Sequence, residues 1–338
     1  MSSRKTSRPL ILVSIMIAMF MIAIEATIVS TVMPKIVGEL GGLQLYSWVF
    51  SAFLLTQTAT TVVFGKLSDL VGRKAVLLFG IGVFLFGSVM CGFAWSMPSM
   101  ILFRLVQGVG AGAIQPVAMT VVGDLYSAQE RGKIQGYLAS VWAISAVIGP
   151  LVGGLVIQHL SWAWIFWVNV PIGLLAAVGF LTYLHEDLDH ARRPIDFLGA
   201  GLFTVAIAAM MIGLTIVSTS GGIEIALLAG LFALSAGLFV VQERRAPEPM
   251  ISLQLWGRRP IAAANGASLL AGMAMIGLTT FLPMYVQGVM RQSALTAGFA
   301  LSVMVLGWPI GATLAARHLS TFGVRRVLVT GRARLEMR

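Results

Sequence analysis

The chain has 338 residues, of which 58% are apolar and only 11% are charged. A soluble domain is usually about half apolar and a quarter charged, so lipid is the expected solvent for most of these side chains. The formal net charge of +10 does not indicate nucleic-acid binding, because the basic residues lie between long apolar runs and act there as topology signals. The single cysteine, Cys91, excludes an internal disulfide framework and a cysteine-based metal cluster, and we expect it to be a small core residue.

Ten apolar runs are long enough for membrane-spanning helices, which need roughly 20 residues each. The first run follows a basic start and is too long for the apolar region of a signal peptide, so we expect it to stay attached as a helix. The predicted fold class is all-α, a polytopic transmembrane helical bundle. The runs cover approximately residues 9–33, 46–65, 75–95, 99–123, 136–158, 164–184, 197–217, 223–242, 260–286 and 295–315.

The distribution of lysine and arginine predicts the orientation of these helices. With the N-terminus in the cytoplasm, 20 of the 23 basic residues fall in cytoplasmic loops or tails. Only Lys35 and Arg291 fall outside, and Arg104 lies within a helix. This bias follows the positive-inside rule. It predicts a multi-pass protein of the inner or plasma membrane with both termini in the cytoplasm.

The turn between the second and third runs carries the sharpest local motif. Gly65 and Gly72 permit close approach and unusual backbone angles. Asp69 is an acid in a basic turn, where its carboxylate can bond Arg73 or a helix N-terminus, and Lys74 completes the motif. Two interpretations remain open: a solvated hairpin, or a gating latch that holds one state of a transporter through charge contacts.

Two charges stand inside the apolar runs. Arg104 lies about one turn into the fourth run, and Glu25 is the only acid well inside a run. Because charge within a bilayer is costly, such residues are functional by default. Counted from the predicted helix ends, both lie at similar depth in the outer half. We expect them to face one aqueous cavity and to interact, with Glu25 as a proton site; the alternative is a structural ion pair between the first and fourth helices.

The fourth run continues with a stretch of small residues after Gln107. Gly108 and Gly112 are four residues apart and share one helix face, so another helix can approach closely, and Gly110 lies between them. Ordinary packing explains such spacing equally well. The pattern therefore predicts a close helix contact but no specific chemistry.

The fifth run combines a proline with a second small-residue face. Pro150 lacks a backbone donor and should kink the helix. Gly149 and Gly153 share a face, and Gly154 follows directly. A Gly-Pro pair beside such a face is more specific than the glycine spacing alone.

Enzymatic signatures are absent from the sequence. There is no P-loop, zinc signature or nucleophile elbow, and the four histidines form no ligand pair at helical spacing. We therefore expect no enzyme activity, no metal site and no cofactor.

Together these motifs resemble the major facilitator superfamily and, more narrowly, its 14-helix drug:proton antiporter family. The resemblance covers residues from about 10 to 330 and rests on five stretches. Those stretches are 25–29 in the first helix, 65–74 in the following turn, 104–110 in the fourth helix, 149–154 in the fifth helix, and 162–173, which is similar to the family's W-R-W-x-F-x-x-N-x-P-x-G pattern.

The resemblance implies a division of the chain. Residues 1–190 would form a six-helix transporter half, 191–245 an extra two-helix hairpin, and 246–338 a partial C-terminal half of two helices and a basic tail. A weak echo of the 65–74 turn at 316–326 is consistent with repeated halves. The family has 14 helices and this chain supplies ten, so we expect a fragment or a prematurely ended reading frame.

The resemblance also implies a function. The leading hypothesis is proton-coupled export of amphipathic or cationic small molecules, with the substrate, protons and the lipid bilayer as partners and no nucleic acid. The arginine of the fourth-helix motif is implicated in proton coupling in the family, and Glu25 replaces the usual aspartate while keeping the charge. A non-transporting membrane remnant and a carrier for another small solute are the alternatives. The sequence specifies no oligomeric state.

Overall fold

A computed structural model describes residues 6–186, 196–217, 221–246, 253–304, 306–307 and 311. Within them, nine helices are long and apolar enough to cross a membrane. The elements are α1 (Arg8–Leu40), η1 (Leu43–Leu45), α2 (Tyr46–Val71), α3 (Arg73–Gly92), α4 (Met97–Leu125), α5 (Ala128–His159), α6 (Trp164–Trp167), α7 (Asn169–Tyr183), α8 (Phe197–Ile216), α9 (Gly222–Arg245), α10 (Leu253–Trp256), α11 (Arg259–Met284) and the π-helical turn η2 (Tyr285–Val289).

The first nine predicted runs are confirmed as helices, the sixth being formed by α6 and α7 together. The tenth is described as a shorter apolar helix, Ala294–Met304, and most of the rest of that run lies outside the described residues. The echo at 316–326 and several basic residues of the tails and of the loop after α7 also lie outside them.

Local sequence signals fix several helix ends. Ser96 and Ser127 begin α4 and α5, and each forms a capping box in which its side chain accepts a hydrogen bond from the third backbone N–H of the helix. At the C-terminal end of α1, Gly41 and Gly42 adopt positive φ angles of 71° and 72°, which residues with an L side chain rarely adopt. α1 therefore ends at this Gly-Gly pair, seven residues beyond the predicted end at residue 33.

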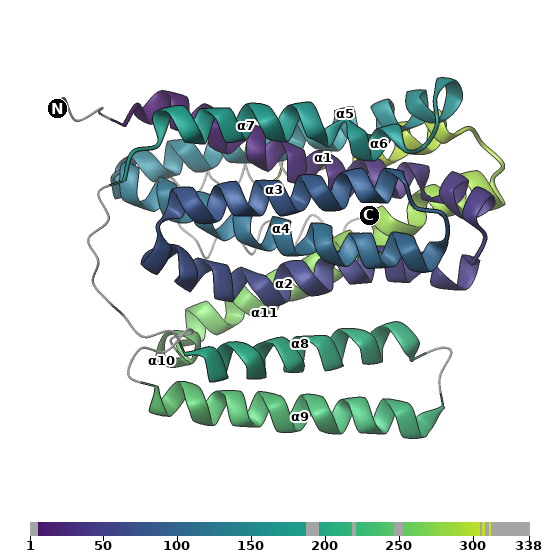
Figure 1. Ribbon diagram of the computed structural model, residues 1–338. Helices are drawn as coiled ribbons and strands as arrows, with labels where there is room; N and C mark the ends of the chain where they lie inside the picture. The colour runs from purple at the N-terminus through teal and green to yellow at the C-terminus, as the bar shows by residue number, and fades with distance from the viewer. Residues whose placement is uncertain are drawn as a thin grey trace.

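The helices α1 to α7 form one bundle, with α4 packed between α2 and α3, while α1 packs on α5 and α7 (Figure 1). The hairpin of α8 and α9 lies along one side of this bundle, where α8 contacts α2 (Figure 1). α11 crosses behind α2 and contacts α1. The buried ionisable residues Glu25 and Arg104 thus lie within the α1–α7 bundle.

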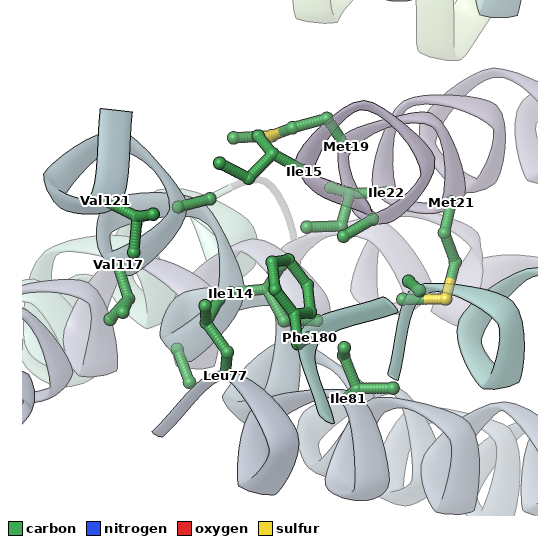
Figure 2. Packing of buried hydrophobic residues seen from close by; sticks show 14 of the residues in the cluster. Ile15, Met19, Met21, Ile22, Leu77, Ile81, Ile114, Val117, Val121 and Phe180 are labelled. Carbon is green, nitrogen blue, oxygen red and sulfur yellow. The ribbon is translucent and has the colours of Figure 1, made fainter. Parts of the chain in front are cut away.

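The core of the bundle is a cluster of branched and aromatic side chains from α1, α3, α4 and α7. The ring of Phe180, fully buried, lies among Ile22, Leu77, Ile81 and Ile114 (Figure 2). Because lipid is as apolar as these side chains, close packing rather than the hydrophobic effect drives such association. This packing holds the helices that carry the polar site in fixed register.

The outer surfaces of the later helices are apolar as well. α9 exposes Leu227 and Leu234, at 69% and 61% of their surface, and α11 exposes Leu270 at 69%. Such surfaces need an apolar solvent. The expectation that lipid solvates most side chains agrees with this arrangement.

Candidate functional site: a buried charge network

The centre of the bundle contains an ion pair between two helices. Nη1 of Arg104 on α4 lies 2.5 Å from Oε1 of Glu25 on α1. The side chains are 3% and 0% exposed, respectively. The guanidinium also lies over the Phe53 ring, 4.2 Å from its centroid, and its Nε donates to the backbone oxygen of Val49 at 3.2 Å. Arg104 therefore connects α1, α2 and α4.

Uncharged polar side chains complete this network. Asn169, at the start of α7, donates from Nδ2 to Oε2 of Glu25 at 2.6 Å and to Oγ of Ser88 at 2.9 Å. Gln107 accepts from Arg104 Nη1 at 2.7 Å and donates to Ser88 Oγ at 3.2 Å. Both Glu25 oxygens thus have a charged or amide donor, which is what a carboxylate in a low-dielectric interior requires. We call these five residues the charge network: Glu25, Ser88, Arg104, Gln107 and Asn169.

The depths of the two charges differ from those predicted from the sequence. Glu25 stands fifteen residues from the end of α1, about 22 Å, whereas Arg104 stands seven residues from the start of α4, about 10 Å. The two charges meet although their distances from the helix ends differ, because α1 extends further than predicted. Both side chains are almost fully buried between packed helices in this conformation.

The glycines of α4 bring its two neighbours close. A Cβ atom at Gly108 would contact the backbone oxygen of Phe53 on α2, and one at Gly112 would lie 2.6 Å from the backbone oxygen of Gln57. A Cβ at Gly110 would lie 2.6 Å from the backbone oxygen of Gly80 on α3. Glycines on two faces of α4 therefore let α2 and α3 approach its backbone closely, and the predicted close helix contact is present on both faces.

The glycine and proline residues of the α5 motif also pack against two neighbouring helices. Gly149 and Gly153 lie against α1, where a Cβ at Gly153 would lie 3.3 Å from the backbone oxygen of Ile28. Gly154 and Pro150 lie against the helix Ala294–Met304. α5 continues as one helix from Ala128 to His159 through Pro150. The motif thus joins α1 to the helix that follows α11.

The turn between α2 and α3 forms ion pairs at the other end of the bundle. Arg73 lies 3.4 Å from Asp69 and 3.1 Å from Asp124 at the end of α4. Gly72 has φ of 94° and allows the chain to reverse. Gly65, in contrast, lies within α2, and no other element in the part of the chain that the structure describes comes within 4 Å of its Cβ position, so the predicted close approach is not seen there.

A further carboxylate binds this turn from the end of the bundle's last helix. The side chain of Glu186 accepts hydrogen bonds from the backbone N–H groups of Arg73 and Lys74, at 3.1 Å and 3.0 Å. The ammonium of Lys74 donates to the backbone oxygen of Leu181 on α7 at 2.7 Å. The N-terminus of α3 is therefore clamped to the C-terminus of α7, where the carboxylate also meets the helix dipole favourably.

Sequence reasoning did not assign a site role to Ser88, Asn169, Asp124 or Glu186. Asn169 had a signal, since it is the asparagine of the 162–173 stretch and lies in an otherwise apolar region. Ser88 and the two acids had none, because serine is common in helices and the acids lie in polar turns. Only their tertiary partners distinguish them.

These observations define a class of protein. Nine apolar helices among the described residues, an enclosed charge network and small-residue helix faces are the features of a polytopic α-helical membrane protein.

Comparison with known proteins gives the family. Residues 15–333 match the model of the Major Facilitator Superfamily, and the chain belongs to this family. Multidrug resistance protein 3 of Bacillus subtilis (strain 168) is 36% identical over 331 residues, which are 97% of this chain and 65% of that protein. Multidrug transporter protein MdtP of the same organism is 34% identical over 337 residues, 97% of this chain and 61% of that protein.

The fold has a counterpart among solved structures. The crystal structure of a D-xylose-proton symporter superposes with a TM-score of 0.56 at 12% identity, covering 93% of this chain and 69% of that chain. The chain spans less than two-thirds of the length of the two Bacillus proteins.

Proposed function

We propose that this chain performs proton-coupled efflux of amphipathic or cationic small molecules across the cell membrane. The observation that carries the proposal is the Glu25–Arg104 ion pair, a carboxylate and a guanidinium that are buried between α1 and α4. Both relatives from Bacillus bear names of multidrug proteins, which supports the substrate class. The 14-helix antiporter assignment, the three-part division of the chain and the cytoplasmic placement of both termini belong to this proposal.

The proposed coupling step follows from the partners of Glu25. A carboxylate at this position bonds α1 to α4 through Arg104 and to α7 through Asn169. A proton on Glu25 removes the charge that Arg104 neutralises, so the attachment of α1 weakens. A ligand that binds one state better shifts the equilibrium toward that state, and the proton acts here as such a ligand on the rocking equilibrium of a transporter.

The proposed transmission uses the other two motifs. α5 packs through Gly149 and Gly153 on α1 and through Pro150 and Gly154 on the helix Ala294–Met304, so a shift of α1 reaches beyond the first half of the chain. The ion pairs of Arg73 hold the α2–α3 turn to α4. We assign this turn the role of a latch, which stabilises one state of the equilibrium.

Reconstitution in liposomes tests the function. With an imposed pH gradient, we expect the chain to move ethidium, a lipophilic cation, in exchange for protons, and Glu25→Gln to abolish the dependence on the gradient. Glu39→Gln is the matched control, because it makes the same change on the same helix at a half-exposed residue. Gradient-driven transport by the Glu25→Gln variant equal to that of the unmodified chain would refute the proton role. Ethidium fluxes equal to those of empty liposomes would refute efflux by this chain.

A further inference from the structure

The amide of Asn169 has one buried half without a partner. Its Nδ2 donates two hydrogen bonds, to Glu25 and to Ser88, whereas its Oδ1 is buried and accepts none from any residue that the structure describes. The residue is fully buried. An unpaired carbonyl in an apolar interior costs free energy. This acceptor lies on the residue that bonds the carboxylate, so it supplies what a protonated Glu25 needs, an acceptor for the acid proton.

We propose that Asn169 is a positioning residue that senses the protonation state of Glu25 by reversing its amide; the inference rests on the proton role proposed above. With the carboxylate, Nδ2 faces Glu25 and donates. With the carboxylic acid, rotation of the amide brings Oδ1 to the same place, where it accepts from the Glu25 hydroxyl. The proton stays on Glu25 throughout, and only the direction of the hydrogen bond reverses.

Reversal of the amide has a consequence at Ser88. The single hydroxyl proton of Ser88 is donated to the backbone oxygen of Phe166 at 2.8 Å, while Oγ accepts from both Asn169 and Gln107. Once Oδ1 of Asn169 faces Ser88, the hydroxyl must turn to donate to it. The Phe166 carbonyl then loses its side-chain donor and keeps only backbone donation. The exchange keeps two hydrogen bonds at Asn169, moves Nδ2 to the unpaired place that Oδ1 held, and removes one hydrogen bond between α3 and α6.

The surroundings leave Glu25 as the group that titrates in this network. The charged or titratable groups facing it are Arg104 from α4 and the thiol of Cys91 from α3. Asn169, Gln107 and Ser88 are uncharged at any accessible pH. Among the described residues, a change of pH therefore reaches the α6 segment through Glu25, Asn169 and Ser88 in turn.

The expected readout is the accessibility of the segment that precedes Phe166. Ala163 is 4% exposed at the start of this segment, and Ser161 nearby is exposed. In a Cys91→Ser background, Ala163→Cys is labelled with a membrane-impermeant maleimide, and Ser161→Cys corrects for the pH dependence of thiol reactivity. The quantity compared is the labelling rate of Ala163→Cys divided by that of Ser161→Cys. We expect this ratio to rise about fivefold on acidification, because the loss of one ordinary hydrogen bond, about 1 kcal/mol, changes an equilibrium by about that factor.

Asn169→Leu separates sensing from protonation. Infrared difference spectra between high and low pH identify the Glu25 acid by the carbonyl band that is missing in Glu25→Gln. In Asn169→Leu we expect this band to appear while the labelling ratio stays constant. If Asn169→Leu does not fold, Asn169→Asp serves instead. Two carboxyl groups at this distance share one proton, so its labelling ratio at neutral pH should already equal that of the unmodified network in acid.

The outcomes distinguish the two proposals. A labelling ratio in Asn169→Leu that follows pH as it does with asparagine present overturns the sensing role and leaves the proton role of Glu25 intact. A neutral-pH ratio in Asn169→Asp that remains at the high-pH value overturns it as well. If the unmodified network shows no carbonyl band of Glu25 between high and low pH, both the sensing role and the proposed proton coupling fall.

Discussion

Replacing Gly110 by alanine tests the claim that glycine closes the contact between α3 and α4. A Cβ at this position would lie 2.6 Å from the backbone oxygen of Gly80 and 2.7 Å from Cα of Phe84. Both are backbone atoms, so no side-chain rotation relieves the contact and the two helices must separate. Overpacking of this kind costs about 1–3 kcal/mol, and the better helix propensity of alanine offsets at most about 1 kcal/mol. With the full offset, we expect a net destabilisation of up to about 2 kcal/mol.

The matched control is Gly82→Ala on α3, where no atom of another described element lies within 4 Å of the Cβ position. There the propensity gain stands alone, and we expect a stabilisation of up to about 1 kcal/mol. Unfolding by denaturant in detergent micelles, followed by tryptophan fluorescence, gives both free energies. The reasoning is refuted if Gly110→Ala is as stable as Gly82→Ala, because the backbone contact would then have no energetic consequence.

Four further predictions concern the charges. Glu25→Gln leaves Arg104 buried with no counter-ion and should destabilise by about 3–5 kcal/mol, whereas adding Arg104→Gln should recover part of this loss; unfolding of the single and double variants measures both. Asp124→Asn should change stability by less than about 1 kcal/mol, since its ion pair is half-exposed; a larger loss in the same assay would contradict this. Glu186→Ala should cost about 1–3 kcal/mol in that assay, because two backbone N–H groups of α3 lose a charged acceptor. Lys133→Cys in intact cells should resist an impermeant maleimide until the membrane is permeabilised; labelling without permeabilisation would reverse the proposed orientation.

The sequence by itself determined the helices and the family. Hydropathy over a window of about 20 residues is a local property, so the first nine spans could be located before any contact was known. Glycine spacing identified the close faces of α4 and α5 for the same reason, since residues four apart share a face whatever lies opposite. Turn residues, such as Gly72 with its positive φ, are equally local.

Apart from the Glu25–Arg104 pair, the partners of the buried polar groups were decided by the tertiary structure alone. The sequence paired Glu25 with Arg104 by their predicted depths. Those depths were counted from predicted helix ends, and α1 ends further along the chain in the structure than predicted. Asn169 is 144 residues from Glu25, and Glu186 is more than 100 residues from the helix it caps. Such contacts depend on how each helix is rotated about its axis and shifted along it. Packing against several neighbours sets both, and no window of sequence contains that information.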